Sequence, residues 1–187
     1  KAGSSIEAVI KGSDLDPSGK LFFEDARIKS EPLGDNKFKV SVHEEVAPGI
    51  YDFRHGGKSG TTSSLSFLVS NLEEVIVKNE AITKDNAMLV DHSMFLNGLA
   101  QKGNAHFFKF FLNENERVFV DCFAERVNSR MDALIVVEDP NGKEVGRSRE
   151  AVGGDPLIDL IAQKSGEYML RVSDFLTRGG DDYWYRI

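Results

Sequence analysis

The side chains that could carry out catalysis are scattered along the sequence. The single cysteine, Cys122, stands in the apolar stretch RVFVDCFAE, whereas catalytic cysteines usually lie in electropositive, partly exposed surroundings. No serine has the G-x-S-x-G spacing that places a hydrolase nucleophile on a sharp turn, and residues 56–60 lack the residue order of a P-loop. We therefore expect Cys122 to be a small buried hydrophobic residue, and we expect no enzyme activity.

The four histidines do not form a metal-binding pattern. His43, His55, His92 and His106 are far apart, and none stands two or four residues from another histidine or from the cysteine. Zinc sites need such closely spaced ligands. His106 begins an apolar run and His55 lies in a Gly-rich stretch, so we expect these histidines to be structural or exposed.

Two groups of carboxylates could act together. Asp121 and Asp159 could meet across a sheet, although outward-facing polar positions explain them equally well. Asp174, Asp181 and Asp182 surround a loop that contains two glycines, where aspartates usually stabilise turns through Asx-type hydrogen bonds. The alternative for Asp181 and Asp182 is contact with a metal ion or a sugar.

Composition limits the classes of function. The 187 residues carry a formal net charge of -7, and no run of basic residues occurs, which argues against a nucleic-acid or anionic-membrane surface. No apolar run approaches the roughly 18 residues of a membrane-spanning helix, so we expect no membrane insertion. A content of 41% hydrophobic and 28% charged residues is ordinary for a globular protein. One cysteine excludes an intrachain disulfide.

The first 70 residues have the pattern of short, half-buried strands. Apolar and polar residues alternate, and turn signals such as Asp16-Pro17-Ser18-Gly19 recur at intervals of roughly 8–12 residues, which is typical of an immunoglobulin-like sandwich. A Gly/Ser/Thr-rich loop is expected over residues 56–64. The predicted strands cover residues 6–10, 20–23, 26–30, 38–42, 50–54 and 65–69.

The second half is also predicted to be all-β. The two most apolar runs, residues 106–112 and 117–123, are expected to be central strands. Arginines 126, 130, 147 and 149 are expected to be solvated. The other predicted strands cover residues 94–99, 134–137, 143–146 and 157–161.

The last 22 residues predict a closing hairpin. Residues 168–172 and 183–187 alternate around the turn signal at 179–181, as two adjacent antiparallel strands would. Alternation assigns Tyr183, Tyr185 and Ile187 to the core face and Trp184 with Arg186 to the outer face. Trp184 stacked against an arginine, either Arg186 or Arg171, is the main candidate for a ligand contact.

The first half resembles the IPT/TIG type of bacterial immunoglobulin-like domain over residues 4–70. The framework is G-x-x-L, A-x-P-G-x-Y and F-x-V in this order. The corresponding residues are GSDL at 12–15, LFF at 21–23, FKVSV at 38–42, APGIY at 47–51, in which alanine directly precedes proline, and FLV at 67–69.

The second half resembles the bacterial pre-peptidase C-terminal domain over residues 79–187. This family has a jelly-roll-like sandwich related to the collagen-binding domains of bacterial collagenases, and it accompanies enzymatic or surface modules without carrying catalysis. The matching residues are NG at 97–98, FFKF at 107–110, AER at 124–126, SRMDA at 129–133, DPNG at 139–142, DPL at 155–157, GEYMLRV at 166–172 and DYWYR at 182–186.

The resemblance raises the question of calcium. Some relatives hold calcium with acidic residues of the entry linker and of the first sandwich loop. Here the linker offers Glu80, Asp85 and Asn86, but the loop at residues 103–106 reads GNAH and lacks both acidic positions. Calcium requires six to eight oxygen ligands, so we expect no cofactor and no bound metal.

Together these observations predict two β-sandwich domains: an immunoglobulin-like domain at 1–72, a linker at 73–86 and a jelly-roll-like domain at 87–187. We expect a non-catalytic accessory or adhesion module of a larger exported bacterial protein that binds protein or polysaccharide. The candidates for ligand contact are Trp184, Asp181, Asp182 and Arg186. The alternative is a structural spacer without its own ligand.

The expected location is extracellular, on the cell surface or periplasmic, and the expected partners include other domains of the same larger chain. The chain begins at Lys1, without a methionine, so we expect a signal peptide or further domains to have been removed.

Overall fold

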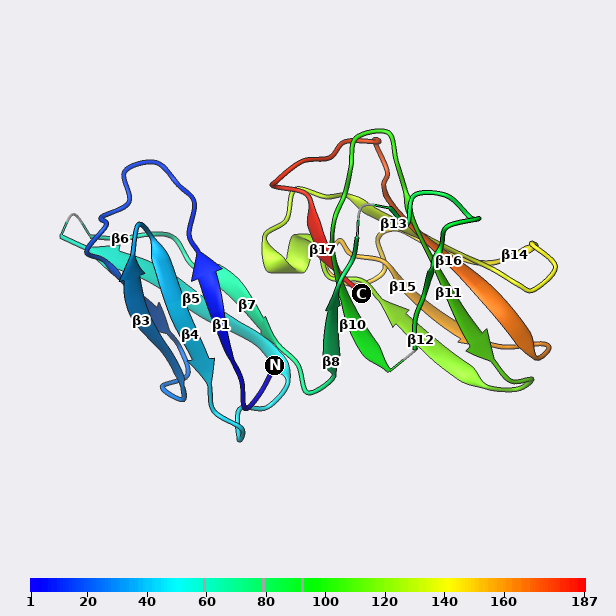
Figure 1. The fold of residues 1–187 in the computed structure, drawn as a ribbon, viewed down its shortest axis with the longest axis horizontal. Helices are drawn as coiled ribbons and strands as arrows, with labels where there is room; N and C mark the ends of the chain where they lie inside the picture. Colours follow the sequence, from blue (N-terminus) through cyan, green and yellow to red (C-terminus); the bar gives the residue numbers. More distant parts are fainter. Residues whose placement is uncertain (59, 79, 92) are drawn as a thin grey trace. The chain divides into compact units, whose positions relative to one another are not determined.

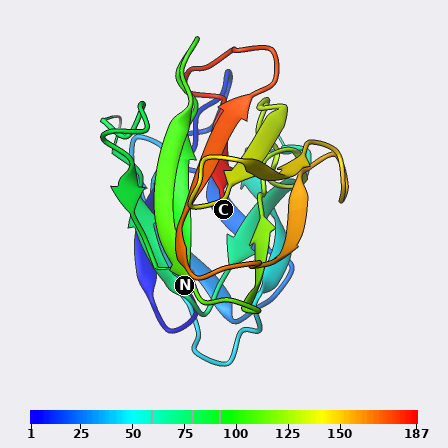
Figure 2. The ribbon, with the colours of Figure 1, turned by 90° about the vertical axis from the view of Figure 1, so that its right-hand side faces the viewer.

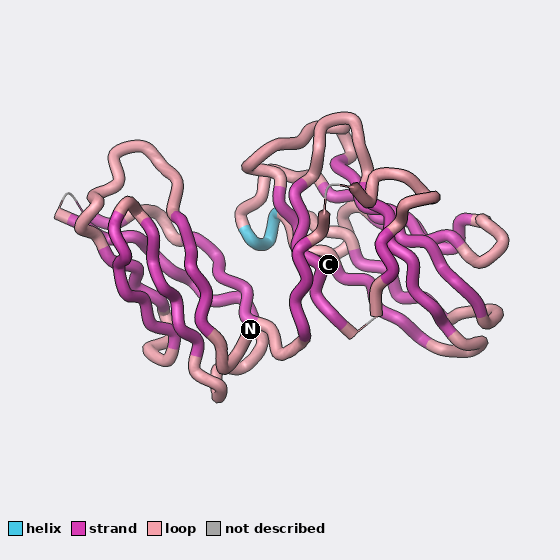
Figure 3. Tube along the Cα trace, in the orientation of Figure 1, coloured by secondary structure: helices cyan, strands magenta, loops and turns pink. Residues whose placement is uncertain are grey.

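The computed structural model describes residues 1–187 except Ser59, Asn79 and His92, and it is nearly all-β. Figure 3 shows strands joined by loops, with one short helical segment, η1 (Glu125–Val127), among the described residues. The chain divides into two compact units, Lys1–Leu72 and Glu73–Ile187, each with its own buried cluster. Within the described residues, no helix is long and apolar enough to cross a membrane.

The first unit is a sandwich of two small sheets. One sheet has the order β1-β4-β3, and in the other β5 pairs with β2, β6 and β7. Alternation explains the core, because Phe38, Val40 and Val42 of β4 are buried while the residues between them are more exposed. The strands are β1 (Ser5–Val9), β2 (Lys20–Phe23), β3 (Ile28–Gly34), β4 (Lys37–Val42), β5 (Gly49–Gly57), β6 (Gly60–Thr61) and β7 (Leu65–Val69).

The expected Gly-rich loop is shorter than predicted, because strand β5 continues through Gly57 and pairs with β6. His55, predicted at the loop, therefore lies within a strand and is 3% exposed. Its ring has room because Gly19 faces it: a Cβ atom at this glycine would lie 2.2 Å from His55 Nε2. Glycine is thus required at this position for steric reasons.

The second unit has two layers of strands. One layer is a five-stranded sheet of order β14-β13-β16-β11-β9, in which β11 and β16 run side by side (Figures 1 and 2). The other layer consists of the pair β12-β15 and the sheet β17-β10-β8. The strands are β8 (Glu73–Ile76), β9 (Met88–Leu89), β10 (Met94–Leu99), β11 (His106–Leu112), β12 (Arg117–Asp121), β13 (Ala133–Glu138), β14 (Glu144–Ser148), β15 (Leu157–Ile161), β16 (Gly166–Asp174) and β17 (Trp184–Arg186).

Side chains from both layers form one core between them. Phe108 and Leu112 of β11, Ile135 of β13 and Tyr168 of β16 belong to the same buried cluster as Tyr185 from the opposite layer, and each is at most 1% exposed. The predicted all-β architecture of β-sandwich type is therefore confirmed. Strand β11 is central, as predicted, but β12 is not. Its ladder partner is β15, and just after its end Phe123 forms a bridge to Arg186 of β17.

The segment predicted as a linker, residues 73–86, begins with a strand. Strand β8 pairs in parallel with β10, and Val75 packs against the core of the second unit. The apolar residues of Glu74-Val75-Ile76-Val77 explain this position, because Val75 and the buried Val77 alternate with outward-facing residues.

The prediction that residues 168–172 and 183–187 form a closing hairpin is wrong. Strand β16 lies in the five-stranded sheet, whereas β17 pairs with β10 in the opposite layer. The connecting loop already runs along β10, since Ala100 donates a hydrogen bond to Tyr183 and Gly180 donates one to Ala100. Gly179 permits this approach, because a Cβ atom there would lie 2.3 Å from the backbone nitrogen of Lys102.

Candidate ligand-binding face

The outer face of the β12-β15 and β17-β10-β8 layer collects aromatic rings and arginines. In the ladder, Asn97 is opposite Arg186 and Leu99 is opposite Trp184, so these side chains share one face. Phe123, which follows β12, forms a bridge to Arg186, so the face extends from β17 to β12. We call it the aromatic face; its residues are Glu74, Ile76, Phe95, Asn97, Leu99, Phe119, Asp121, Phe123, Trp184 and Arg186, with Arg117 and Arg126 above its rings.

Arg186 lies on this face as alternation predicts, but its partners differ from the expected Trp184. Its guanidinium lies 4.9 Å from the centre of the Phe95 ring, and its Nη2 is 2.8 Å from Oε1 of Glu74. The side chain is only 16% exposed, and burial lowers the pKa of the guanidinium. Arg186 is thus held in place before any ligand arrives.

Trp184 is partly exposed beside Arg186. Its indole nitrogen Nε1 donates a hydrogen bond of 3.3 Å to the carbonyl oxygen of Val127, the last residue of η1. The polar end of the ring is therefore satisfied, while part of its apolar surface faces outward.

Arg126, predicted to be solvated, is instead 17% exposed and anchored. It donates to Asp155 at 3.0 Å and to the carbonyl of Cys122 at 2.8 Å, and it forms an ion pair with Asp121. Desolvation opposes its charge, yet the hydrogen bonds with the two aspartates raise its pKa. Its guanidinium lies 4.0 Å from the centre of the Phe123 ring.

The buried carboxylate of Asp155 organises the loop under Arg126. This side chain is fully buried and accepts hydrogen bonds from the backbone N–H groups of Ala124, Glu125 and Arg126, at 2.9, 2.8 and 3.1 Å. These hydrogen bonds replace the hydration that the carboxylate loses on burial. Asp155 thus fixes the backbone that presents Phe123 and Arg126.

The two carboxylates that could have met across a sheet bind arginines instead. Asp159 is opposite Phe119 in the ladder and accepts two hydrogen bonds from Arg117, at 2.8 and 2.6 Å. Asp121 pairs with Arg126, as described above. Each charge is balanced by a neighbour, which does not fit a pair of carboxylates sharing a proton.

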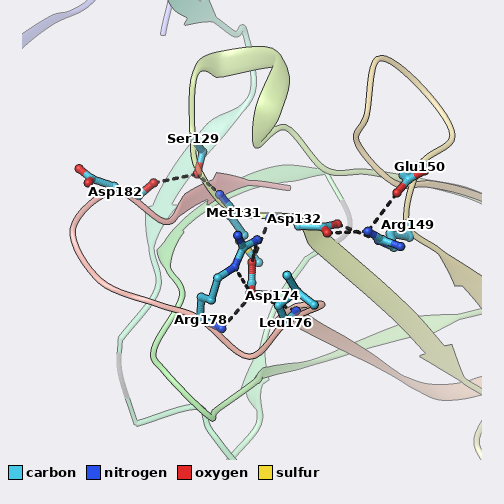
Figure 4. A network of polar contacts seen from close by, with 9 residues as sticks. All are labelled: Ser129, Met131, Asp132, Arg149, Glu150, Asp174, Leu176, Arg178 and Asp182. Carbon is cyan, nitrogen blue, oxygen red and sulfur yellow. Dashed lines mark hydrogen bonds and ion pairs between the residues drawn. The ribbon is translucent and has the colours of Figure 1, made fainter.

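The loop after β16 is organised by Asp174, as expected for an Asx-type turn residue (Figure 4). Asp174 is 3% exposed and accepts from the backbone N–H groups of Leu176 and Arg178, at 3.1 and 2.8 Å, and from that of Asp132 at 3.0 Å. The Arg178 guanidinium also donates to it. Desolvation opposes this charge, but the hydrogen bonds from Arg178 lower the Asp174 pKa.

Asp181 and Asp182 are exposed on this loop, just before β17, and lie outside the ladder that forms the aromatic face. The carbonyl oxygen of Asp182 accepts hydrogen bonds from Arg130 N at 2.8 Å and Ser129 Oγ at 3.3 Å. The structure therefore brings Trp184 and Arg186 onto one face, and places Asp181 and Asp182 at its loop end.

All three candidate calcium ligands, Glu80, Asp85 and Asn86, are exposed. The side-chain oxygen of Asn86 accepts a hydrogen bond of 2.9 Å from the backbone nitrogen of Thr83, within its own turn. Among the residues that the structure describes, no group of three His, Cys, Asp or Glu side chains could hold a metal ion.

Comparisons with known proteins find likeness only among solved structures. No family model and no curated protein matches the chain. The pre-peptidase C-terminal domain of a Bacillus anthracis collagenase is 16% identical, over 54% of this chain and 90% of that one, with a TM-score of 0.45. SGBP-B of the Bacteroides ovatus mixed-linkage glucan utilisation locus, in complex with a mixed-linkage heptasaccharide, is 9% identical, over 92% of this chain and 70% of that one, with a TM-score of 0.29.

The first of these structures is a domain of the kind that the second half of the sequence resembles. The IPT/TIG resemblance of the first half stays a prediction.

The remaining candidates for chemistry are parts of the fold or lie apart from the face. Cys122 is fully buried, and burial raises its pKa well above the usual thiol value, which confirms the prediction of a buried hydrophobic residue. His106 is 3% exposed and its Nδ1 lies 2.7 Å from the Tyr185 hydroxyl. His43 is exposed, and His92 lies outside the described residues.

Sequence reasoning missed Phe95, Phe123 and Asp155. The period of two in β10 would have placed Phe95 on the face of Asn97 and Leu99. For Asp155 the sequence contains no local signal, because its partners lie about 30 residues away along the chain.

Proposed function

We propose that this chain is a non-catalytic accessory or adhesion module of a larger exported bacterial protein, and that its aromatic face binds a protein ligand. One observation supports this proposal most strongly. Trp184, Phe95 and Phe123 lie on one outer sheet face together with two anchored arginines, Arg186 and Arg126. Aromatic residues and arginine are enriched at protein interfaces and among the residues that dominate binding energy.

The arginines favour a protein over a polysaccharide. A sugar ring that stacks on an aromatic side chain needs an open ring face. Here guanidinium groups lie over Phe95, Phe119 and Phe123, at 4.9, 4.7 and 4.0 Å from the ring centres. A protein partner can instead contact ring edges and the apolar side chains beside them, such as Leu99 and the exposed Ile76.

Arrays of matrix proteins and of polysaccharides test the proposal. We expect the chain to bind a protein on the array, and we expect Trp184→Ala and Phe119→Ala each to weaken this binding about 10-fold or more, which is the loss of a central contact. Phe111→Ala is the matched control, because Phe111 is a similarly exposed ring (56%, against 59% for Phe119) in the opposite layer.

Retention by a polysaccharide alone would show a carbohydrate module. No retention on either array would indicate a structural spacer. Either result contradicts the proposal.

A further inference from the structure

An open groove lies in the first unit, where the turn at residues 16–19 meets strands β5 and β6. Its volume is about 470 Å³, within the range of roughly 300–1,000 Å³ that is common for small-molecule sites. Lys20 and Phe22 of β2, Gly56 of β5 and Thr61 of β6 line it. The groove shares no residue with the aromatic face, which belongs to the second unit.

Two glycines keep this groove open. A Cβ atom at Gly56 would lie 2.7 Å from Cε2 of the Phe22 ring, and one at Gly57 would lie 2.4 Å from the Cβ atom of Asp16. Any side chain at these positions would displace the ring and the turn. The ring of Phe22 therefore rests against the backbone of β5 at Gly56.

The other side of the Phe22 ring is accessible. The residue is 57% exposed, and within the part of the chain that the structure describes no second ring and no guanidinium lies over it. Guanidinium groups do lie over Phe95, Phe119 and Phe123 of the aromatic face. An open aromatic face carries partial negative charge, which attracts the C–H groups on the face of a sugar ring. Phe22 thus meets the requirement that the rings of the aromatic face do not meet.

Asp16 holds one end of the groove in shape. Its Oδ1 accepts hydrogen bonds from the backbone nitrogen and the hydroxyl of Ser18, at 2.8 and 2.7 Å, and its Oδ2 accepts one of 2.8 Å from the backbone nitrogen of Lys58. The hydrogen bond from Lys58, followed by those from Ser18, lowers the pKa of Asp16 to about 2. Both oxygens are thus engaged, and the carboxylate fastens the turn at residues 16–19 to the segment after β5.

Two lysines bring positive charge to the lining. Lys20 and Lys58 are exposed, and among the residues that the structure describes neither forms a salt bridge. Thr61 adds an exposed hydroxyl beside them. In a chain with a net charge of -7, two such ammonium groups beside an open ring favour a ligand that carries its own negative charge.

The backbone around the groove favours a sugar over an extended peptide. Gly56 is already paired with Lys20 of β2 on one side and with Thr61 of β6 on the other, and Gly57 is paired with Gly60. A peptide that binds by strand addition needs a free edge, which this floor does not offer. A sugar needs only side-chain contacts.

We propose that this groove binds an acidic sugar residue of a polysaccharide, such as a uronic acid. The face of the sugar ring stacks on Phe22, its carboxylate lies between the ammonium groups of Lys20 and Lys58, and Thr61 contacts a hydroxyl. This site is independent of the protein-binding function proposed above, because the aromatic face takes no part in it. Either proposal can therefore fail without the other.

The probe is trigalacturonic acid, titrated into the whole chain and followed by the backbone amide signals in NMR, with neutral galactotriose as its control. We expect shifts concentrated at Lys20, Phe22, Gly56 and Thr61. The neutral sugar should bind about 10-fold more weakly, because it lacks the charged hydrogen bonds to lysine.

Three variants test the assigned contacts. Phe22→Ala should weaken binding about 10-fold, whereas Phe22→Tyr, which keeps the ring, should retain it. Lys20→Gln should weaken binding of the acidic sugar but not of the neutral one. Lys39→Gln is its matched control, because Lys39 is an exposed lysine of β4 in the other sheet of the same unit. If Phe22→Ala disturbs the fold, as its amide spectrum would reveal, Lys20→Gln and Phe22→Tyr still decide.

Four results would overturn the proposal. The first is the absence of shifts at millimolar trigalacturonic acid. The second is equal affinity for galactotriose, which would show that the lysines play no part. The third is tighter binding of an aspartate oligopeptide, which would assign the groove to an acidic peptide. The fourth is binding that Trp184→Ala removes and Phe22→Ala does not, which would place the sugar on the aromatic face.

Discussion

At the scale of single residues, the buried polar side chains determine how the loops of the second unit are held. Asp155 joins residues 124–126 to a position about 30 residues later, and Arg126 links it to Asp121. A buried charge of this kind is costly to leave without its partner.

Asp155→Ala should therefore lower the free energy of unfolding by about 3 kcal/mol, because it leaves three backbone donors and a mostly buried arginine without their acceptor. Urea denaturation measures this loss. Asp159→Ala is the matched control: it removes a carboxylate paired with Arg117 on the exposed surface, so its effect should be much smaller. Equal losses in the two variants would contradict the role assigned to Asp155.

His106 makes stability depend on pH. Burial lowers its pKa, so the unfolded chain takes up a proton at a higher pH than the folded protein does. The contribution of the neutral ring is fully present above the unfolded pKa of about 6.5 and is lost as pH falls through the folded pKa.

Urea denaturation between pH 7.5 and 5 should show this loss in the wild type and a flatter curve in His106→Phe. The exposed His43 provides the control, since His43→Gln should keep the slope of the wild type. An unchanged slope in His106→Phe would assign the pH dependence to other groups.

At the scale of elements, close contact between strands decides which residues are tolerated. Gly98 of β10 is opposite Tyr185, which is 1% exposed, and a Cβ atom at Gly98 would lie 2.4 Å from the tyrosine ring. The glycine therefore allows the Tyr185 ring to lie across β10 and reach His106.

Gly98→Ala should destabilise the second unit by about 1–3 kcal/mol through this overpacking. A double-mutant cycle with Tyr185→Ala tests the cause, because Gly98→Ala should lower the free energy of unfolding less when the tyrosine ring is absent. Additive losses would show that the cost arises elsewhere, for example in the backbone.

At the scale of the whole molecule, the chain consists of two units with separate cores. The expectation that no metal ion is bound stays a prediction; in the structure the side-chain oxygen of Asn86 accepts a hydrogen bond from the backbone nitrogen of Thr83. A ligand that binds the native state alone raises its stability in proportion to its occupancy.

We accordingly expect the melting temperature to be the same, within error, in millimolar calcium and in excess chelator. Differential scanning calorimetry of the whole chain measures both. A decrease of several degrees in melting temperature on chelation would contradict this expectation and show a stabilising calcium site, for which Glu80 and Asp85 are the candidate ligands.

The sequence by itself determined the all-β class and most of the strands. Strands β2, β7, β10, β11 and β15 have the predicted bounds, because alternation of apolar and polar residues is a local property of a strand with one buried face. The same period placed Tyr185 in the core and Trp184 with Arg186 outside.

Only the tertiary structure decided which strands are neighbours. Strands β16 and β17 have the local pattern of a hairpin, yet their loop crosses to the opposite layer, where Gly179 and Asp174 fix its path through contacts distant in sequence. Arg126 and Phe95 also have partners distant in sequence, Asp155 and Arg186. Local alternation specifies the face of a side chain, whereas pairing depends on non-local contacts that a single strand does not encode.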